Sequence, residues 1–309
     1  MKTQVRKFIP GVVNHCYQNT SGGFLLFYTV SDFLVFFTIF SSVSHRRRVR
    51  VLKLCLMYDH IHVVVIAESI DELNSFVRDY TSAYTREFHR FAGTGGMLFN
   101  KSYGSAPKRV DKAVRSTLIY SDNNPVERKL VAKAEEYRWN FLAFTNSSHP
   151  FSERLVLRQS SKPLRSAICE VKARYSVENY LPYAMLQRLF ARLNREEKQQ
   201  LTDYIINTYS VIDHGYSIEA FGSYEDELTA VHSTTGSEYD IKEVFVGRDD
   251  RIYGKMTAML LGTGRFQDIH EVLSLPDSQK MDLIEFLISR LAVTPEQAAK
   301  YLHVAIRKV

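Results

Sequence analysis

Two apolar segments, RVRVLKLCLM (48–57) and HIHVVVIA (60–67), are separated by only two residues. In the first segment basic residues alternate with apolar ones, which is typical of a strand with one wetter face. The short break predicts that the two strands pair as a hairpin. Because a strand alternates its side chains, His60 and His62 are expected on one face, about 6.6 Å apart.

A long amphipathic helix is predicted directly after this hairpin, at 69–91, with a capping box formed by Ser69 and Glu72. The other elements expected in this half are a strand at 11–18, a short strand or loop at 96–105, and helices at 110–125 and 126–136. The helix at 110–125 is expected to stop at or near Asn124-Pro125. The pattern predicts an α+β fold in which helices pack against an antiparallel sheet.

The polar stretch TNSSHPFSE (145–153) is the predicted boundary between domains 1–147 and 148–309. The second domain is expected to be mainly helical. Its clearest signals are an amphipathic pair at 181–209 with a break near Asn194, and two helices within 277–303. The second of those begins at Thr294, which can act as N-cap in a capping box with Gln297.

The run FLLFYTVSDFLVFFTIF (24–40), followed by basic residues, is similar to a signal anchor. It is shorter than the roughly 20 residues that span a bilayer, and it carries Asp32 at its centre. Ser31 and Asp32 favour a helix start, so we expect a strand ending near Tyr28 and a buried helix at 32–43. No membrane partner is predicted.

The net charge is distributed unevenly along the chain. Residues 1–150 hold 20 Lys and Arg against 12 Asp and Glu, whereas the remainder holds 20 against 22. The basic excess of the first half favours a polyanionic partner. The three cysteines form no CxxC pair and are expected to be free thiols, which fits a cytoplasmic protein.

Two further residues could complete a site with the histidine pair. Neutral imidazole is a good ligand for divalent cations, and a phosphate oxygen can complete an unfinished shell. Tyr120 and Asn124 are four residues apart in one predicted helix and therefore share a face. A helix packed over the strand would bring the Tyr120 hydroxyl and the Asn124 amide oxygen above His60 and His62.

The segments LMYDHIHVVV, YTSAYTREFHRFAGTGGMLF, IYSDNNPVERKLV and EYRWNFLAF occur in this order. Together they resemble the HUH endonucleases, and particularly the REP-associated single-tyrosine transposases, over about residues 8–145. Three features depart from that family's pattern. Asp59 replaces the usual Asn before the first histidine, His89 stands where Asn is frequent, and NFL at 140–142 replaces two serines.

The resemblance implies a ferredoxin-like HUH fold and a transposase that nicks and joins single-stranded or hairpin DNA. It also implies that Tyr120 forms the 5′-phosphotyrosine, while His60, His62 and Asn124 hold Mg²⁺ or Mn²⁺. In a DNA enzyme the following basic residues would neutralise phosphates, although each could also be a solvated surface residue: Arg46, Arg47, Arg48, Arg50, Lys101, Lys108 and Arg109.

Simpler interpretations stay open for several of these residues. Tyr120 could be a packed helix tyrosine, and Tyr80 and Tyr84 fit the apolar stripe of the long helix. His15 and His45 look structural or incidental.

Two other functions stay open for the whole chain. A catalytically inactive or domesticated DNA-binding regulator could use the same scaffold, and a metal hydrolase could use the histidines without a covalent tyrosine. The helical domain could serve DNA binding, docking or oligomerisation, including a homodimer.

Overall fold

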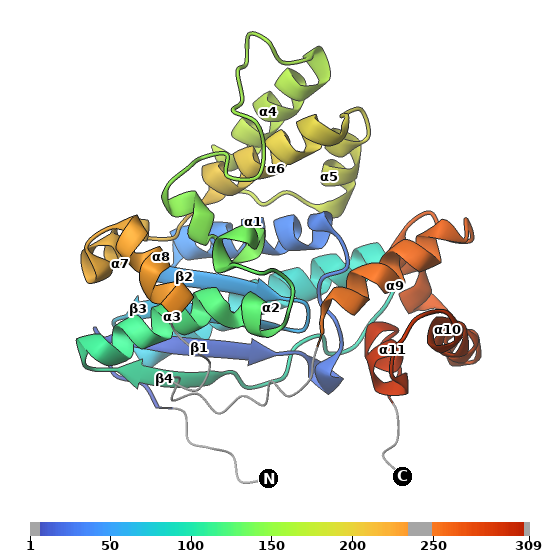
Figure 1. The fold of residues 1–309 in the computed structure, drawn as a ribbon, viewed down its shortest axis with the longest axis horizontal. Helices are drawn as coiled ribbons and strands as arrows, with labels where there is room; N and C mark the ends of the chain where they lie inside the picture. Colours follow the sequence, from blue (N-terminus) through green and yellow to red (C-terminus); the bar gives the residue numbers. More distant parts are fainter. Residues whose placement is uncertain (1–6, 234–248, 306–309) are drawn as a thin grey trace.

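A computed structural model describes residues 7–233 and 249–305 of the chain. The N-terminal half forms one antiparallel sheet with the strand order β2-β3-β1-β4, and helices pack around it (Figure 1). The strands are β1 (Val13–Asn19), β2 (Val49–Met57), β3 (His60–Ala67) and β4 (Gly104–Lys108). The predicted hairpin is confirmed as β2 and β3, and the predicted α+β class of this half is confirmed with it.

The two faces of β3 are buried against different helices. Those helices are α1 (Val30–Arg46), α2 (Ile70–Ala92) and α3 (Asp111–Glu127). Ile61 belongs to the large apolar cluster that includes residues of α1 and α2. On the other face, Val64 packs with Leu118 of α3. Because side chains alternate along a strand, His60 and His62 lie on the face that α3 covers.

Helix α1 contains most of the apolar run at 24–40 and is buried along nearly its whole length. It begins two residues earlier than predicted, because the backbone N–H of Thr29 donates to the Asp32 carboxylate at 2.7 Å. The strand expected just before it is not formed by residues 24–29. Leu26 instead donates its N–H to the carbonyl oxygen of Tyr58 at 2.6 Å, so the segment packs on the β2–β3 turn. Among the described residues, no helix has the length and apolar character that a membrane crossing needs.

Two details of α2 and α3 differ from the sequence prediction. Ser69 caps α2 by accepting from the N–H of Glu72 at 3.1 Å, but the Glu72 carboxylate accepts from the N–H of Arg48 at 3.0 Å instead of completing the box. Helix α3 continues through Pro125 to Glu127. A proline this close to the end of a helix removes only one late hydrogen bond, so the helix is not broken there.

The helix expected at 126–136 is wrong. After α3 the chain turns at Lys129, whose φ is 58°, and continues as short 3₁₀ turns. The Glu136 carboxylate stabilises the first turn by accepting from the N–H groups of Ala132 and Lys133 at 3.2 and 3.1 Å. The turns are η2 (Ala134–Glu136), η3 (Arg138–Asn140) and η4 (Leu142–Thr145).

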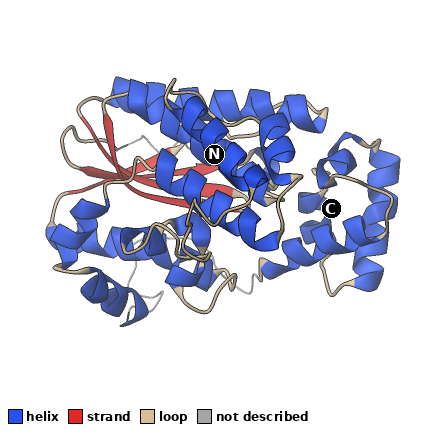
Figure 2. Cartoon of the chain, turned by 90° about the horizontal axis from the view of Figure 1, so that it is seen from above, coloured by secondary structure: helices blue, strands red, loops and turns tan. Residues whose placement is uncertain are grey.

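The rest of the described chain is mainly helical, as predicted. Helices α4–α6 pack over α1, α7 and α8 lie beside α3 and β2, and α9–α11 lie beyond the β2–β3 turn (Figures 1 and 2). The helices are α4 (Lys162–Tyr175), α5 (Tyr183–Phe190), α6 (Arg195–Tyr209), α7 (His214–Phe221), α8 (Tyr224–Ser233), α9 (Arg251–Gly262), α10 (Asp277–Arg290) and α11 (Pro295–Tyr301).

The predicted break near Asn194 and the predicted helix start at Thr294 are both confirmed. The side chain of Asn194 accepts from Glu197 N–H at 2.9 Å, and that of Thr294 accepts from Gln297 N–H at 3.2 Å. The boundary at 147/148 falls between η4 and α4 and stays a prediction.

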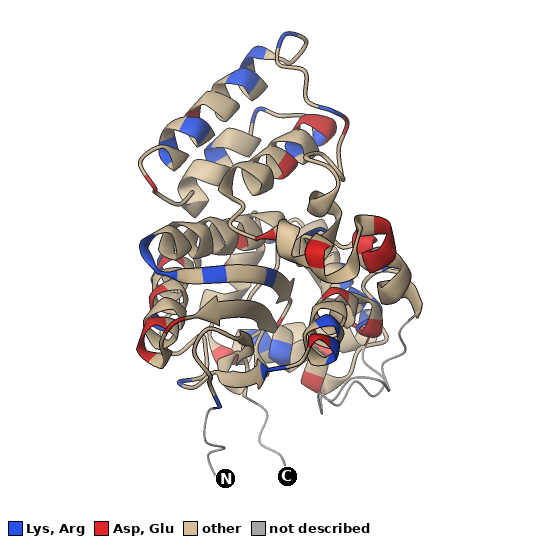
Figure 3. Ribbon diagram, turned by 90° about the vertical axis from the view of Figure 1, so that its left-hand side faces the viewer, with Lys and Arg blue, Asp and Glu red and all other residues tan. Residues whose placement is uncertain are grey.

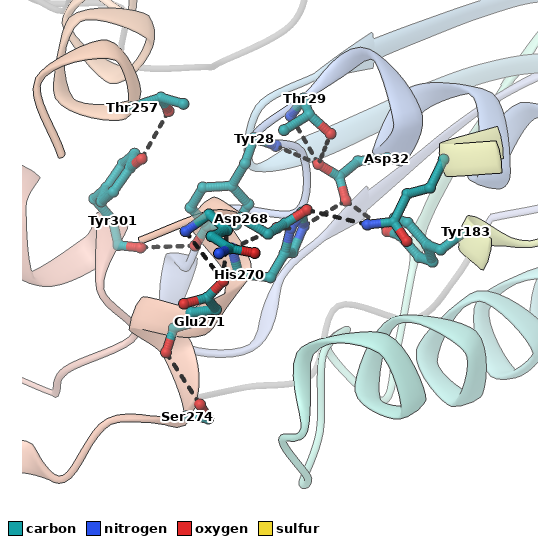
Figure 4. A network of polar contacts seen from close by, with 12 residues as sticks. Tyr28, Thr29, Asp32, Tyr183, Thr257, Asp268, His270, Glu271, Ser274 and Tyr301 are labelled. Atoms are coloured by element: carbon teal, nitrogen blue, oxygen red, sulfur yellow. Dashed lines mark hydrogen bonds and ion pairs between the residues drawn. The ribbon is translucent and has the colours of Figure 1, made fainter. Parts of the chain in front are cut away.

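A buried ionic network joins the C-terminal helices to α1 (Figure 4). His270, in the 3₁₀ segment Ile269–Ser274, has Nε2 2.7 Å from Asp32 Oδ1 and Nδ1 2.6 Å from Asp268 Oδ1. The hydroxyl of Tyr183 donates to the same Asp32 oxygen at 2.5 Å. Burial alone would lower the pKa of His270, but the two carboxylates raise it to about 10. A charged imidazole therefore links three regions of the chain.

Candidate functional site

The two histidines of β3 approach a single amide of α3. His60 Nε2 lies 3.3 Å from Asn124 Oδ1, and His62 Nε2 lies 3.2 Å from Asn124 Nδ2. The two imidazole rings are nearly perpendicular, with centroids 4.9 Å apart. The Asn124 carboxamide thus lies between the two Nε2 atoms.

Tyr120 joins the same cluster from one helical turn earlier. Asn124 Nδ2 donates to Tyr120 Oη at 3.3 Å, as expected for side chains four residues apart on one helix face. The Tyr120 ring meets the His62 ring edge-on, with centroids 5.3 Å apart. The structure therefore brings together the nucleophile and the three ligands that the sequence suggested: Tyr120, His60, His62 and Asn124.

The Nδ1 atom of each histidine is held by a second side chain. His60 Nδ1 lies 2.6 Å from Asp59 Oδ1, and His62 Nδ1 lies 3.0 Å from His15 Nε2 on β1. Such contacts fix the ring orientation and leave the other nitrogen of each ring available to a ligand. Both available nitrogens, the two Nε2 atoms, point toward Asn124.

The electrostatics of the cluster favour neutral imidazoles at His15 and His62 and an ionised carboxylate at Asp59. Burial and then Lys108 lower the pKa of His15 to about 3. Burial, followed by the neighbouring His60 and His15, holds the pKa of His62 well below its ordinary value. Burial alone would raise the pKa of Asp59, but His60 and nearby cations hold it well below its usual range. A neutral His62 can offer a lone pair to a cation.

The donor set fits a divalent cation. Two imidazole Nε2 atoms converge on one amide, and both rings are oriented by partners at Nδ1, which is the arrangement that metal-binding histidines adopt. Among the described residues, no group of three or more His, Cys, Asp or Glu side chains is arranged to hold a metal. A cation would therefore take His60, His62 and the Asn124 oxygen, with phosphate or water as further ligands.

The cluster is closed from solvent. Tyr120, His62 and Asn124 are fully buried, and His60 is only 3% exposed. The C-terminal region contributes to this closure, because Lys300 of α11 forms an ion pair with Asp59.

A second contact from the C-terminal region reaches the end of α3. Asp250, just before α9, lies 3.6 Å from the Arg128 guanidinium. Arg128 is buried and close enough to His62 to lower its pKa.

Both β3 and α3 lie within a segment that known proteins share. Residues 31–147 match the family model described as "Transposase IS200 like". This segment is similar to the IS200-like transposases. A solved structure described as "Structure of the REP associates tyrosine transposase bound to a REP hairpin" is also similar, with 16% identity, 47% of this chain and 85% of that chain covered, and a TM-score of 0.41. No curated protein matches the chain.

Two residues beside the candidate site, His15 and Lys300, were not singled out as functional from the sequence, and both lie outside the matched segment. His15 precedes the IS200-like segment and was interpreted as structural or incidental, yet it contacts His62. Its position on a predicted strand was a usable signal, but only the pairing of β1 with β3 places it opposite Val64 and beside His62. Lys300 gave no signal, because its partner Asp59 is remote in sequence.

The basic residues that the sequence suggested for DNA binding do not lie together. Met57 pairs with His60 while Val49 pairs with Ala67, so the arginines around the start of β2 lie at the end of the sheet away from the histidines (Figure 3). Those arginines are Arg46, Arg47, Arg48 and Arg50.

Several of these basic residues have other partners. Arg47 forms an ion pair with Asp79, and Arg50 lies 2.6 Å from Asp213.

The remaining three predicted cations divide between the two ends of the sheet. Lys108 pairs with Val13 at the far end and is followed by the exposed Arg109. Lys101 follows Asn100, whose N–H donates to the carbonyl of Asn19 at 3.0 Å, close to the histidine end.

Proposed function

We propose that the IS200-like segment nicks and rejoins single-stranded or hairpin DNA through Tyr120. The observation that supports this most strongly is the cluster itself. The Tyr120 hydroxyl and the Nε2 atoms of His60 and His62 all approach the Asn124 amide within 3.2 to 3.3 Å. A phenol, two oriented imidazoles and an amide in one place suit attack on a phosphodiester better than packing alone.

The proposed step is a transesterification. Tyr120 Oη attacks the scissile phosphorus, a new O–P bond forms, and the bond from phosphorus to the 3′ oxygen breaks. The phenol loses its proton and the leaving oxygen gains one, which gives a 5′-phosphotyrosine and a free 3′ hydroxyl. One phosphodiester is exchanged for another, so the reverse reaction joins strands without ATP.

The chain's own residues would hold and orient the reacting groups. A phenol has a pKa of about 10 and is a poor nucleophile at neutral pH, so the phosphate must be activated. Mg²⁺ or Mn²⁺ held by His60, His62 and Asn124 would supply Lewis-acid activation and a template for in-line attack. Asn124 also donates to Tyr120 Oη, which fixes the position of the hydroxyl oxygen.

Burial of the cluster supports one rival function. Because Tyr120 is fully buried, DNA can reach its hydroxyl only after the surrounding residues move. A chain that never opens would bind DNA on its surface and act as a noncatalytic regulator.

One incubation separates these alternatives. The full chain is mixed with labelled hairpin DNA carrying single-stranded flanks, with Mn²⁺ or with EDTA, and the products are separated under denaturing conditions. A protein–DNA adduct that requires Mn²⁺ supports the proposed enzyme. DNA binding with no adduct supports the regulator, and cleavage without an adduct supports a metal hydrolase.

A further inference from the structure

A groove of about 630 Å³ lies between α2 and the segment 96–103. Its floor includes Gln18, whose neighbours in the strand place it on the face of the sheet opposite His60 and His62. The candidate site does not use this groove. We propose that it binds the phosphodiester backbone of a single DNA strand that flanks the hairpin, an inference that rests on the proposed DNA substrate.

One wall of the groove is a face of α2. Asn74, Arg78, Ser82 and Arg86 follow one another at intervals of four residues and therefore form a single stripe along the helix. The hydroxyls of Thr81 and Thr85, next to this stripe, donate to helix carbonyls at 2.7 Å. The short side chain of Ser82 leaves room for a chain to approach the helix between Arg78 and Arg86.

The opposite wall and the floor come from residues around the end of β1. Gln18 Nε2 donates to the carbonyl of Asn100 at 2.9 Å, which holds the segment 96–103 against the strand. Met97 is 60% exposed on this wall, and Phe99 also lines the groove. The exposed Met97 offers an apolar surface against which an unstacked base can pack, and the buried Phe99 supports this wall from beneath.

The charge of the groove has one sign. Its charged lining residues, within the part of the chain that the structure describes, are Arg78, Arg86 and Lys101, with no Asp or Glu. Arg86 and Lys101 are exposed and have no ion-pair partner among the described residues. Arg78 Nε is 3.3 Å from Asp79, but that carboxylate also pairs with Arg47. Three cations, of which only Arg78 has a carboxylate partner and shares it with Arg47, suit a polyanionic chain.

Size and position favour a single strand over a duplex. The volume of about 630 Å³ lies within the range of small-ligand pockets, which suits about two nucleotides and is too small for paired strands. The groove also lies at the histidine end of the sheet, because Gln18 pairs with Ile61 and Asn19 pairs with His60. A strand that leaves the groove across the end of β1 would therefore arrive beside the candidate site.

The test measures DNA binding by fluorescence anisotropy. The triple variant Arg78→Ala, Arg86→Ala, Lys101→Ala is compared with a control that removes three exposed cations outside the groove. The control is Arg154→Ala, Arg158→Ala, Lys162→Ala. The probes are a hairpin with single-stranded flanks, the same hairpin with blunt ends, and polyglutamate as competitor. Each variant is checked for an unchanged melting temperature, and Arg86→Glu provides a second, single substitution.

We expect the groove triple to weaken binding of the flanked hairpin at least about tenfold near 0.1 M salt, and to reduce the salt slope by about 2. The blunt hairpin and the control triple should each change less than about twofold. The proposal would be overturned if the groove triple lost equal affinity for both hairpins, or if both triples lost equal affinity for the flanked hairpin. It would also be overturned if polyglutamate displaced the flanked hairpin as readily as unlabelled DNA does.

Adduct formation distinguishes the two proposals. If wild type forms the adduct and the groove triple binds the flanked hairpin normally, the groove inference fails while the proposed function stands. If wild type forms no adduct but the groove triple loses flank binding, the proposed function fails and the groove stands.

Discussion

His15 Nε2 lies 3.0 Å from His62 Nδ1, and both rings are buried. When His62 offers Nε2 to a cation, its Nδ1 carries the proton and donates it to His15. We therefore predict that His15→Phe, which keeps a ring but removes the acceptor, weakens Mn²⁺ binding about 10- to 100-fold. Isothermal titration with Mn²⁺ measures this, and His15→Gln, which restores an acceptor, should recover part of the affinity.

The Mn²⁺ titration also distinguishes a His15 that orients the His62 ring from a His15 that only packs in the core. If His15→Phe binds Mn²⁺ like wild type, or if His15→Gln is as weak as His15→Phe at equal stability, His15 acts only in the core.

The proposed ligands make a stronger prediction. His62→Ala removes one of the two converging Nε2 atoms. Its Mn²⁺ affinity should therefore fall by at least about 100-fold, which is the largest loss expected when only a residue that orients a ligand is replaced. Asn124→Ala should cause a smaller loss, since water can replace one oxygen ligand. His45→Ala, at an exposed position, is the matched control. Unchanged titration of His62→Ala would rule out this site.

A buried ionic triad beside the cluster should dominate the stability of this face. Lys53 Nζ lies 2.9 Å from Asp122 and 2.8 Å from Glu227, and all three side chains are buried. Lys53→Met leaves two carboxylates without their cation, so the free energy of unfolding should fall by about 3–5 kcal/mol. Urea denaturation measures this change.

A compensating variant checks the cause. Adding Asp122→Asn and Glu227→Gln to Lys53→Met should restore much of the lost stability, because no uncompensated charge is then buried. A triple variant as unstable as the single one would show that Lys53 packing, rather than its charge, is responsible.

The His270 network predicts the pH dependence of stability. Its pKa is raised from 6.5 to about 10 in the folded chain, so the imidazolium contributes fully below pH 6.5 and its contribution is lost as the pH rises toward 10. Across that window, wild type should lose up to about 1.4 kcal/mol per pH unit relative to His270→Gln. Denaturation at several pH values tests this, with the exposed His45→Gln as control. Parallel curves for wild type and His270→Gln would contradict it.

Local patterns were sufficient for the hairpin that carries the two histidines and for the long helix that follows it. The alternation of 48–67 and the helical spacing of 69–91 depend on neighbouring residues, and the structure has two paired strands and a helix at these places. The helix predicted at 126–136 failed because side-chain contacts of Glu136 favour short turns there. Contacts between distant segments, such as Lys300 with Asp59, depend on the packing of the whole chain and leave no local pattern.

The most direct test of the account identifies the residue that carries DNA after reaction with a flanked hairpin and Mn²⁺. Peptide mass spectrometry of the digested adduct should find the nucleotide on Tyr120, and Tyr120→Phe should yield no adduct while still binding the hairpin. Tyr80→Phe, a buried tyrosine of α2, should form the adduct normally. An adduct that persists in Tyr120→Phe, or a nucleotide found on another residue, would contradict the account.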